Sequence, residues 1–192
     1  MRVERITLYS DGSCHGNPGP GGYAAIILKP DGKTINVSGS DWYTTNNRME
    51  LTAVIEGLKL LSSPSIVTII TDSKYVADPI NRGSIRALIS NPKKANRDLW
   101  EKVLSLSKKH TLSAKWVKGH AGNKLNEKCD VLANDEVRKL EREKDIRQHT
   151  IAELLLNPAE SPENIARRYP GGCPVKTVQK YYEQFMEKRG GF

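Results

Sequence analysis

The feature that most constrains the fold is a short apolar run, IVTIIT, at residues 66–71. Turn-forming residues bound it on both sides, and Asp72 follows it directly. A nearly continuous apolar strand of this length is typical of a strand buried on both faces, as in a parallel sheet. The chain is therefore expected to contain a sheet with helices packed against it.

The segments around this run predict a mixed α/β layer fold, because three strands precede an alternation of helices and strands. Asn47 and Glu50 are spaced as a capping box at the start of one predicted helix. Asp31 and Gly32 mark a tight turn within an antiparallel meander. The expected strands are 3–10, 23–29, 34–42, 66–71 and 112–117, the Gly-rich stretch 11–22 is expected to be a loop, and helices are expected at 47–62, near Ser73, at 98–109 and at 124–142.

The character of the chain changes after about Glu143, which predicts a domain of residues 1–142 and a helical extension of residues 143–192. The charged stretch EREKDIR is typical of a helix end or connector. Prolines and Gly171-Gly172 then separate three short helical candidates. These are expected at 149–156, 162–168 and 174–188.

The net charge of +8 favours a polyanionic partner, although a merely soluble basic protein remains an alternative. Residues 1–140 carry seven of these eight net charges. Three cysteines without a CxxC pair predict neither a disulfide framework nor a structural zinc site. The N-terminus lacks the pattern of a signal peptide and no apolar run could span a bilayer, so a cytoplasmic protein without membrane contact is expected.

Four carboxylates occupy positions from which they could converge. Asp11 and Asp72 lie at the ends of two predicted strands, where open α/β sheets place their sites. Glu50 and Asp130 lie near the starts of two predicted helices. Singly, each has an ordinary alternative as a turn residue, a cap or a solvated side chain. Together, carboxylates without zinc-type ligands favour a hard cation such as Mg²⁺, and two such ions can clamp an in-line displacement.

Four sequence motifs, in register along residues 3–140, resemble those of type 1 ribonuclease H. They are YSDGSCHGNPGPGGYAAIIL, TTNNRMELTAVIEGL, ITDSKYV and KWVKGHAGNKLNEKCDVLA. The resemblance implies a five-stranded mixed β-sheet flanked by helices, here with a small helical C-terminal extension. It also implies cutting of the RNA strand of RNA–DNA hybrids to 5′-phosphate and 3′-hydroxyl ends. Two Mg²⁺ ions are expected during catalysis, with Mn²⁺ able to substitute, in a monomer that removes replication primers and R-loops.

The same resemblance assigns roles by position. Asp11, Glu50, Asp72 and Asp130 correspond to the metal-binding carboxylates, and His120 to a mobile histidine that assists proton transfer or product release. Asn126 corresponds to an asparagine that orients this region, whereas Asn123-Lys124-Leu125 replaces the His-Pro-Glu stretch frequent in the family. A pocket for a DNA phosphate is expected at Thr45. The residues expected to line the hybrid groove are Cys14, Asn17, Asn46, Asn47 and Lys74, with helix capping as the alternative for the two adjacent asparagines.

Two regions depart from the family pattern. A shortened basic stretch after the TDS motif is expected to contact backbone phosphate, with a solvated charge run as the alternative, and only Trp100 remains of its aromatic residues. The residues of this basic handle are Arg82, Arg86, Lys93, Lys94 and Arg97.

The C-terminal extension, which could contact nucleic acid or another protein, faintly resembles a helix-turn-helix. Phosphate contacts would then come from Arg167, Arg168, Lys176 and Lys180. The favoured alternative is a helical appendage packed on the domain through Leu154, Leu155, Tyr181, Tyr182 and Phe185.

Two other functions compete with that of a hybrid-cutting nuclease. A hybrid-binding module without catalysis would have no need for a cluster of like charges facing a polyanion. A DNA-cutting enzyme of the same superfamily would not need the Cys14, Asn17, Asn46 and Asn47 set, which favours RNA recognition instead.

Overall fold

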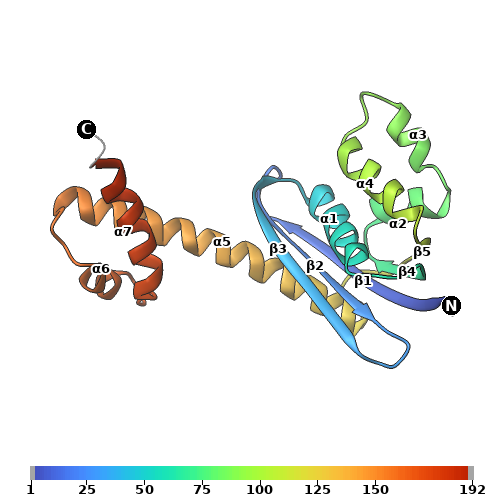
Figure 1. Cartoon of the computed structure of the whole chain (residues 1–192), viewed down its shortest axis with the longest axis horizontal. Helices are drawn as coiled ribbons and strands as arrows, with labels where there is room; N and C mark the ends of the chain where they lie inside the picture. Colours follow the sequence, from blue (N-terminus) through green and yellow to red (C-terminus); the bar gives the residue numbers. More distant parts are fainter. Residues whose placement is uncertain (1–2, 190–192) are drawn as a thin grey trace. The chain divides into compact units, whose positions relative to one another are not determined.

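The computed structural model describes residues 3–189 and confirms the predicted α/β fold (Figure 1). A five-stranded sheet has the order β3-β2-β1-β4-β5. The first three strands are antiparallel neighbours, whereas β4 is parallel to both β1 and β5. The strands are β1 (Glu4–Cys14), β2 (Gly19–Leu28), β3 (Thr34–Thr44), β4 (Ser65–Thr71) and β5 (Thr111–Trp116).

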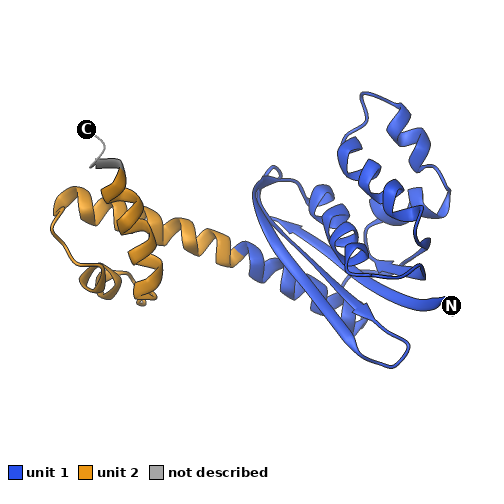
Figure 2. Cartoon of the chain, in the orientation of Figure 1, with its two compact units in different colours: residues 1–137 blue, residues 138–192 orange. Residues whose placement is uncertain are grey.

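Helices connect and cover the strands, and the chain divides into two compact units, residues 1–137 and 138–192 (Figure 2). In the described part of the chain, the helices are α1 (Asn46–Lys59), α2 (Lys74–Asn81), α3 (Ile85–Ser90), α4 (Arg97–Ser107), α5 (Lys124–Leu156), α6 (Pro162–Arg168) and α7 (Val175–Arg189). None of the described helices is long and apolar enough to cross a lipid bilayer.

The apolar run that opened the sequence argument is the centre of the first unit. Val67 and Ile69 on β4 are fully buried in a core that also contains Leu51, Leu58 and Trp100 from α1 and α4. The other face of the sheet is closed by a smaller cluster in which Ala24 and Ile26 of β2 pack against Cys129 and Ala133 of α5. Helices on both faces explain why this sheet tolerates a continuous apolar strand.

The predicted Gly-rich loop at 11–22 is too long, because β1 continues to Cys14 and β2 begins at Gly19, which leaves only residues 15–18 between the strands. The glycines fit here because neighbouring backbones approach closely. A Cβ on Gly12 would lie 2.3 Å from the Glu50 amide nitrogen, and one on Gly22 would lie 2.1 Å from the Ala133 carbonyl oxygen. Glycine in a strand marks such close approach as well as a turn.

The predicted capping box of Asn47 and Glu50 is also wrong. Helix α1 begins at Asn46, and the Thr45 side chain is its N-cap, accepting a hydrogen bond from the Arg48 amide. Neither asparagine therefore supplies the cap. The helix ends at Lys59 rather than at Ser62.

Helix α5 is much longer than predicted, since it runs without interruption from Lys124 to Leu156. The expected connector after Glu143 and the separate helix at 149–156 are therefore wrong. The stretch EREKDIR contains no Gly or Pro and consists mostly of good helix formers, so nothing in it stops the helix.

The second unit has its own apolar cluster, built from the C-terminal half of α5 together with α6 and α7. Leu154, Ile165 and Val178 are fully buried at its centre. Leu155 is 67% exposed, so the prediction that it packs against protein is wrong. Tyr181, Tyr182 and Phe185 do pack against apolar residues, as predicted. Their partners in this cluster belong to the second unit itself and not to the first domain.

Candidate active site

Asp11 and Asp72 lie on adjacent parallel strands at the same edge of the sheet. Asp11 is only 7% exposed within β1, and Asp72 follows the last residue of β4. The register pairs Tyr9 with Ile70, which brings the ends of the two strands level. Asp11 Oδ1 accepts a hydrogen bond from the Gly12 amide at 2.7 Å.

Glu50 projects from α1 toward the same edge and is 9% exposed. Its Oε1 accepts a hydrogen bond from Asn46 Nδ2 at 2.9 Å, and its Oε2 accepts one from Ser73 Oγ. Ser73 also caps α2, where its side chain accepts from the Val76 amide. The carboxylate is thus held by two polar side chains rather than turned back to its own helix start.

Asp130 is held through a chain of side-chain hydrogen bonds that links α5 to β1. Asn134 Nδ2 donates to Asp130 Oδ1 at 2.8 Å, and Asn134 Oδ1 accepts from Ser13 Oγ at 2.8 Å. Asp130 Oδ2 lies 4.0 Å from His120 Nδ1. The fourth carboxylate is therefore fixed on one side and faces the predicted mobile histidine on the other.

The pKa of Asp11 connects the four carboxylates electrostatically. Burial raises this pKa to about 8, and the negative charges of Asp72, Asp130 and Glu50 add to the effect. Burial likewise raises the pKa of Glu50 to about 7, with a further contribution from Asp72 that the hydrogen bonds from Ser73 and Asn46 oppose. Crowded carboxylates with raised pKa values are a common feature of catalytic sites.

The chemistry of these donors fits a hard divalent cation. They are all carboxylate oxygens, and in the described part of the chain no Lys or Arg forms an ion pair with any of the four. As the side chains lie, no group of three or more His, Cys, Asp or Glu among the described residues is already arranged to hold a metal ion. The carboxylates would therefore have to move closer together to share one.

The loop that carries His120 is tightly shaped. His120 is 80% exposed and has a left-handed backbone with φ of 52°. A Cβ on Gly119 would lie 2.6 Å from Asp72 Oδ2, so the missing side chain leaves room for that carboxylate. The loop ends where Asn123 accepts a hydrogen bond from the Asn126 amide at 3.3 Å and so caps α5. Asn126 itself is 2% exposed.

The residues predicted to line the hybrid groove gather around the start of α1. Asn17 Oδ1 accepts a hydrogen bond from the Asn46 amide at 3.1 Å, and Cys14 Sγ donates to the Thr44 carbonyl at 3.4 Å. Burial raises the pKa of the Cys14 thiol, which does not favour a reactive thiolate. Asn47 is exposed beside them.

Lys74 lies on another element, at the start of α2. Its Nζ is 4.9 Å from the centre of the exposed Trp116 ring. The Trp116 indole in turn donates to the Asp72 carbonyl at 2.7 Å. Lys74 is therefore connected to the carboxylate site through Trp116.

The predicted basic handle is only partly available to a partner. Arg82 pairs with Asp78 at 3.2 Å and Arg97 pairs with Glu101 at 2.9 Å, each within its own helix. Trp100 is fully buried and stacks at an angle on Tyr75, so it belongs to the core and not to the handle. The exposed members without an ion-pair partner in the described chain are Arg86, Lys93 and Lys94.

Sequence reasoning missed three residues that hold this site together: Ser73, Asn134 and Trp116. Asn134 follows Asp130 by four residues, which is one helical turn, and that spacing alone could have indicated the contact. Ser73 bonds to Glu50 because α1 packs beside the end of β4, and Trp116 reaches the site because β5 pairs with β4. No local signal reveals either contact.

Comparison with known proteins decides the family. A sequence model of the family described as RNase H matches residues 3–138. The chain belongs to the ribonuclease H family. A ribonuclease H of Trichodesmium erythraeum is 48% identical over 148 residues, which cover 73% of this chain and 94% of that protein. A ribonuclease HI of a Synechocystis strain is 47% identical and covers 67% of this chain and 86% of its own length.

Solved structures agree with this assignment. LC9-RNase H1, described as a type 1 RNase H with the type 2 active-site motif, matches with a TM-score of 0.64 and 29% identity, covering 72% of this chain and 74% of that one. LC11-RNase H1, solved in complex with an RNA/DNA hybrid, has a TM-score of 0.55 and 23% identity, and it shows the fold alone. The protein is therefore a ribonuclease H enzyme, and hydrolysis of the RNA strand of RNA–DNA hybrids is the activity that its family assigns.

Proposed function

We propose that the enzyme cuts hybrid RNA with two Mg²⁺ ions held by Asp11, Glu50, Asp72 and Asp130, leaving 5′-phosphate and 3′-hydroxyl ends. The observation that carries this proposal is the raised pKa of Asp11, because burial and three neighbouring carboxylates all oppose its charge. Such a cluster, without basic partners, is destabilised at neutral pH unless a cation joins it. Mn²⁺, another hard oxygen-binding cation, is expected to replace Mg²⁺.

Different residues of the site would serve different roles in phosphodiester hydrolysis. Bound at the carboxylates, the ions would polarise the scissile phosphate and lower the pKa of an attacking water. Asn46 and Ser73 orient Glu50, and Asn134 orients Asp130, so that two carboxylates are held before substrate arrives. His120, exposed and 4.0 Å from Asp130, would deliver a proton to the leaving oxygen as it departs.

Hybrid recognition would come from the surface next to the carboxylates. Asn17, Asn46, Asn47 and Cys14 lie around one corner formed by β1, β3 and α1, where 2′-hydroxyl contacts are expected. Thr45 would donate its hydroxyl hydrogen to a DNA phosphate although it also caps α1, because the cap uses its oxygen only as an acceptor. LC11-RNase H1 is a relative in fold solved with such a hybrid.

We also propose that residues 1–142 form the catalytic domain and act as a cytoplasmic monomer on replication primers and R-loops. Arg86, Lys93 and Lys94 would then contact backbone phosphate from the short helical region after α2. Residues 143–192 would serve as a helical extension with a separate role.

Metal titration tests the proposed site directly. Isothermal titration calorimetry with Mg²⁺ and with Mn²⁺ is expected to show binding to the wild-type protein and about 10- to 100-fold weaker binding to Asp72→Asn. Asp41→Asn is the matched control, because Asp41 is exposed and accepts a hydrogen bond from the nearby Tyr43 amide at 3.1 Å. Equal affinity in the wild-type protein and Asp72→Asn would contradict the metal assignment.

A further inference from the structure

The second unit is a folded module that the proposed reaction does not use. Ile146 and Leu154 of α5, Ile165 of α6, and Val178 and Tyr181 of α7 are all buried against one another. The three helix segments therefore have fixed positions within this unit. Its exposed side chains consequently form a defined surface rather than a flexible tail.

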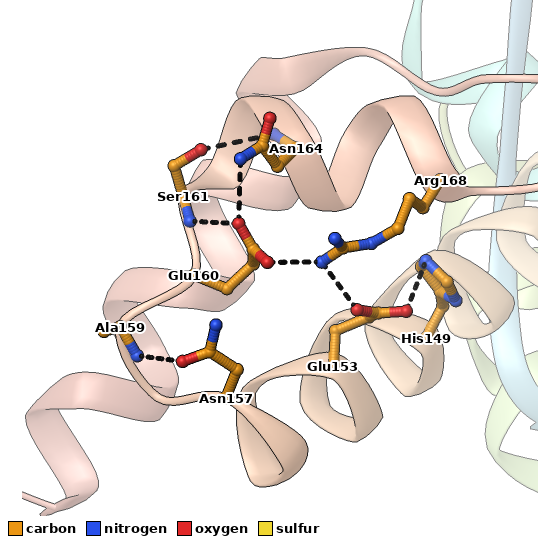
Figure 3. Close-up of polar contacts among 8 residues, drawn as sticks. All are labelled: His149, Glu153, Asn157, Ala159, Glu160, Ser161, Asn164 and Arg168. Atoms are coloured by element: carbon orange, nitrogen blue, oxygen red, sulfur yellow. Dashed lines mark hydrogen bonds and ion pairs between the residues drawn. The ribbon is translucent and has the colours of Figure 1, made fainter.

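One part of this module is a closed network of charges (Figure 3). Arg168 Nη2 lies 2.8 Å from Glu153 Oε2 and 2.7 Å from Glu160 Oε2, and Glu160 Oε1 also accepts from Asn164 Nδ2 at 2.9 Å. His149 Nε2 lies 3.9 Å from Glu153 Oε1. Arg168 is thus held by two carboxylates, which occupy the charge that the sequence offered for a phosphate contact.

A different part of the module carries positive charge without acidic partners. Lys176 and Lys180 lie one turn apart in the first half of α7, both are exposed, and neither has an ion-pair partner among the described residues. Lys180 Nζ lies 5.2 Å from the centre of the Tyr181 ring, which orients its chain. The first acidic residue of α7 is Glu183, and Gln179 already donates to it.

Arg142 of α5 is a third exposed cation, and it lies near the start of α7. Its Nη2 donates to the Gly172 carbonyl at 3.2 Å, which fixes it beside the connection between α6 and α7. A hollow of about 300 Å³ joins α5 to the start of α7, and its lining residues are Lys139, Arg142, Glu143, Ile146, Pro174 and Thr177. We define the basic face as Arg142, Lys176 and Lys180.

We propose that residues 138–189 bind the phosphate backbone of duplex nucleic acid through this basic face. The order of α6 and α7 resembles a helix-turn-helix, in which the first half of the second helix meets the duplex. The connection, residues 169–174, is longer than the usual three- or four-residue turn. Contacts to phosphate carry no sequence information, so we expect the module to bind duplexes without preference for particular bases.

Nucleic acid is favoured over an acidic protein because the same chain is a ribonuclease H. A second duplex contact in one chain raises the effective concentration of substrate at the catalytic unit. This inference rests on the proposed function only for the nature of that substrate, namely a hybrid. Contact with a duplex of any kind follows from the charge of the basic face itself.

A charge-matched pair of full-length variants tests the inference. The basic-face variant is Arg142→Ala/Lys176→Ala/Lys180→Ala, and the control is Lys144→Ala/Arg147→Ala/Arg167→Ala, which removes three other exposed cations of the same module. Binding to a long RNA–DNA hybrid and to DNA duplex of the same sequence is followed by fluorescence anisotropy in EDTA over a range of salt. Circular dichroism checks that both variants keep their helices.

The basic-face variant is expected to lose about two to three units of the slope of log K against log salt, because each phosphate contact contributes about 0.9. The control is expected to lose less than one unit. Equal losses in the two variants would overturn the inference. An unchanged slope with the basic-face variant would also overturn it, and would favour an acidic protein as the partner of this face. Lys176→Ala/Lys180→Ala, which leaves the Arg142 to Gly172 bond intact, should show about two-thirds of the effect.

The failure of the two proposals can be told apart by cleavage. Turnover of a hybrid too short to reach both units, at saturating concentration, should be the same in the wild-type protein and the basic-face variant. A wild-type protein that cuts no hybrid would contradict the proposed function, yet its binding to duplex DNA would still report on the basic face.

Discussion

Asn134 Nδ2 donates a hydrogen bond to Asp130 Oδ1 at 2.8 Å, so an asparagine that no motif pointed to holds one of the four carboxylates in place. The oxygen of the same side chain, Asn134 Oδ1, accepts from Ser13 Oγ at 2.8 Å, which ties the position of Asp130 to β1 and hence to Asp11. Replacing a side chain that orients a metal ligand in this way typically weakens metal affinity or activity by about 10- to 100-fold.

Replacing Asn134 with Ala is expected to raise the Mg²⁺ concentration needed for half-maximal activity by about 10-fold or more, because Asp130 would lose its fixed orientation. Hybrid cleavage measured across a Mg²⁺ series checks this expectation. Asn164→Ala, which removes an asparagine of the C-terminal module, is the control. A variant of Asn134 whose Mg²⁺ dependence matches that of the wild-type protein would show that the contact is only structural.

Gly119→Ala is expected to lower activity by about 10-fold or more while leaving the melting temperature nearly unchanged. The added Cβ would lie 2.6 Å from Asp72 Oδ2. Because that atom is the end of a side chain, the fold can adjust by turning the carboxylate away, and a displacement of about 1 Å is costly in catalysis. Ala121→Ser, in the same loop, is the control. Loss of stability in place of activity would contradict this explanation.

Asp11→Asn is expected to stabilise the metal-free enzyme at neutral pH. The pKa of Asp11 is raised from 3.8 to about 8, so between these values the folded state holds a proton that the unfolded state releases. Stability therefore falls as pH rises through this window. Asparagine removes that dependence, and an increase of about 2–4 °C in melting temperature corresponds to about 1 kcal/mol.

The test of this stabilisation is differential scanning fluorimetry in EDTA across the pH range. The advantage of Asp11→Asn should vanish in acid below pH 3.8, because the wild-type Asp11 carboxyl is then protonated in both the folded and the unfolded state. Asp31→Asn should give no gain in melting temperature, because the Lys33 amide and the Lys33 side chain both donate to the Asp31 carboxylate and lower its pKa. A variant of Asp11 less stable than the wild-type protein at neutral pH would refute the burial argument.

Acid is expected to loosen the second unit through Glu160. Hydrogen bonds from Arg168, Asn164 and the Ser161 amide lower the pKa of Glu160 from 4.5 to about 2. The contribution of this carboxylate is therefore fully present above pH 4.5 and is lost as pH falls toward about 2. The protection of amides in residues 153–168 against hydrogen exchange, relative to the intrinsic rate at each pH, should fall over this range in the wild-type protein.

Glu160→Gln should remove most of that pH dependence, whereas Glu163→Gln, which changes an exposed carboxylate on α6, should keep it. Protection that stays constant in the wild-type protein between these pH values would show that the network of Arg168 contributes nothing to local stability.

The mixed α/β class and the placement of two carboxylates at strand ends could be predicted because each left a local signal. The apolar run at 66–71 required burial on both faces, and strand ends carried Asp11 and Asp72. The motifs then matched a family whose fold is known. The boundaries of the last two helices of the extension could be predicted because prolines and glycines separate them.

What could not be predicted depends on packing between distant segments. Glycines at 12, 21 and 22 are typical of a loop, yet they lie in strands because α1 and α5 approach those backbones closely. The role of Thr45 as the cap of α1 is no clearer in the sequence than that of its asparagine neighbours. Similarly, Arg168 reads as a free cation until Glu153 and Glu160 are placed beside it.

The most direct test of the central claim is cleavage of three labelled duplexes, the RNA–DNA hybrid, duplex RNA and duplex DNA, with Mg²⁺, Mn²⁺ or EDTA. We expect only the RNA strand of the hybrid to be cut, only with metal, and to give 5′-phosphate and 3′-hydroxyl ends, with Asp72→Asn inactive but folded. Equal cutting of duplex DNA, or cutting of the hybrid in EDTA, would contradict the account.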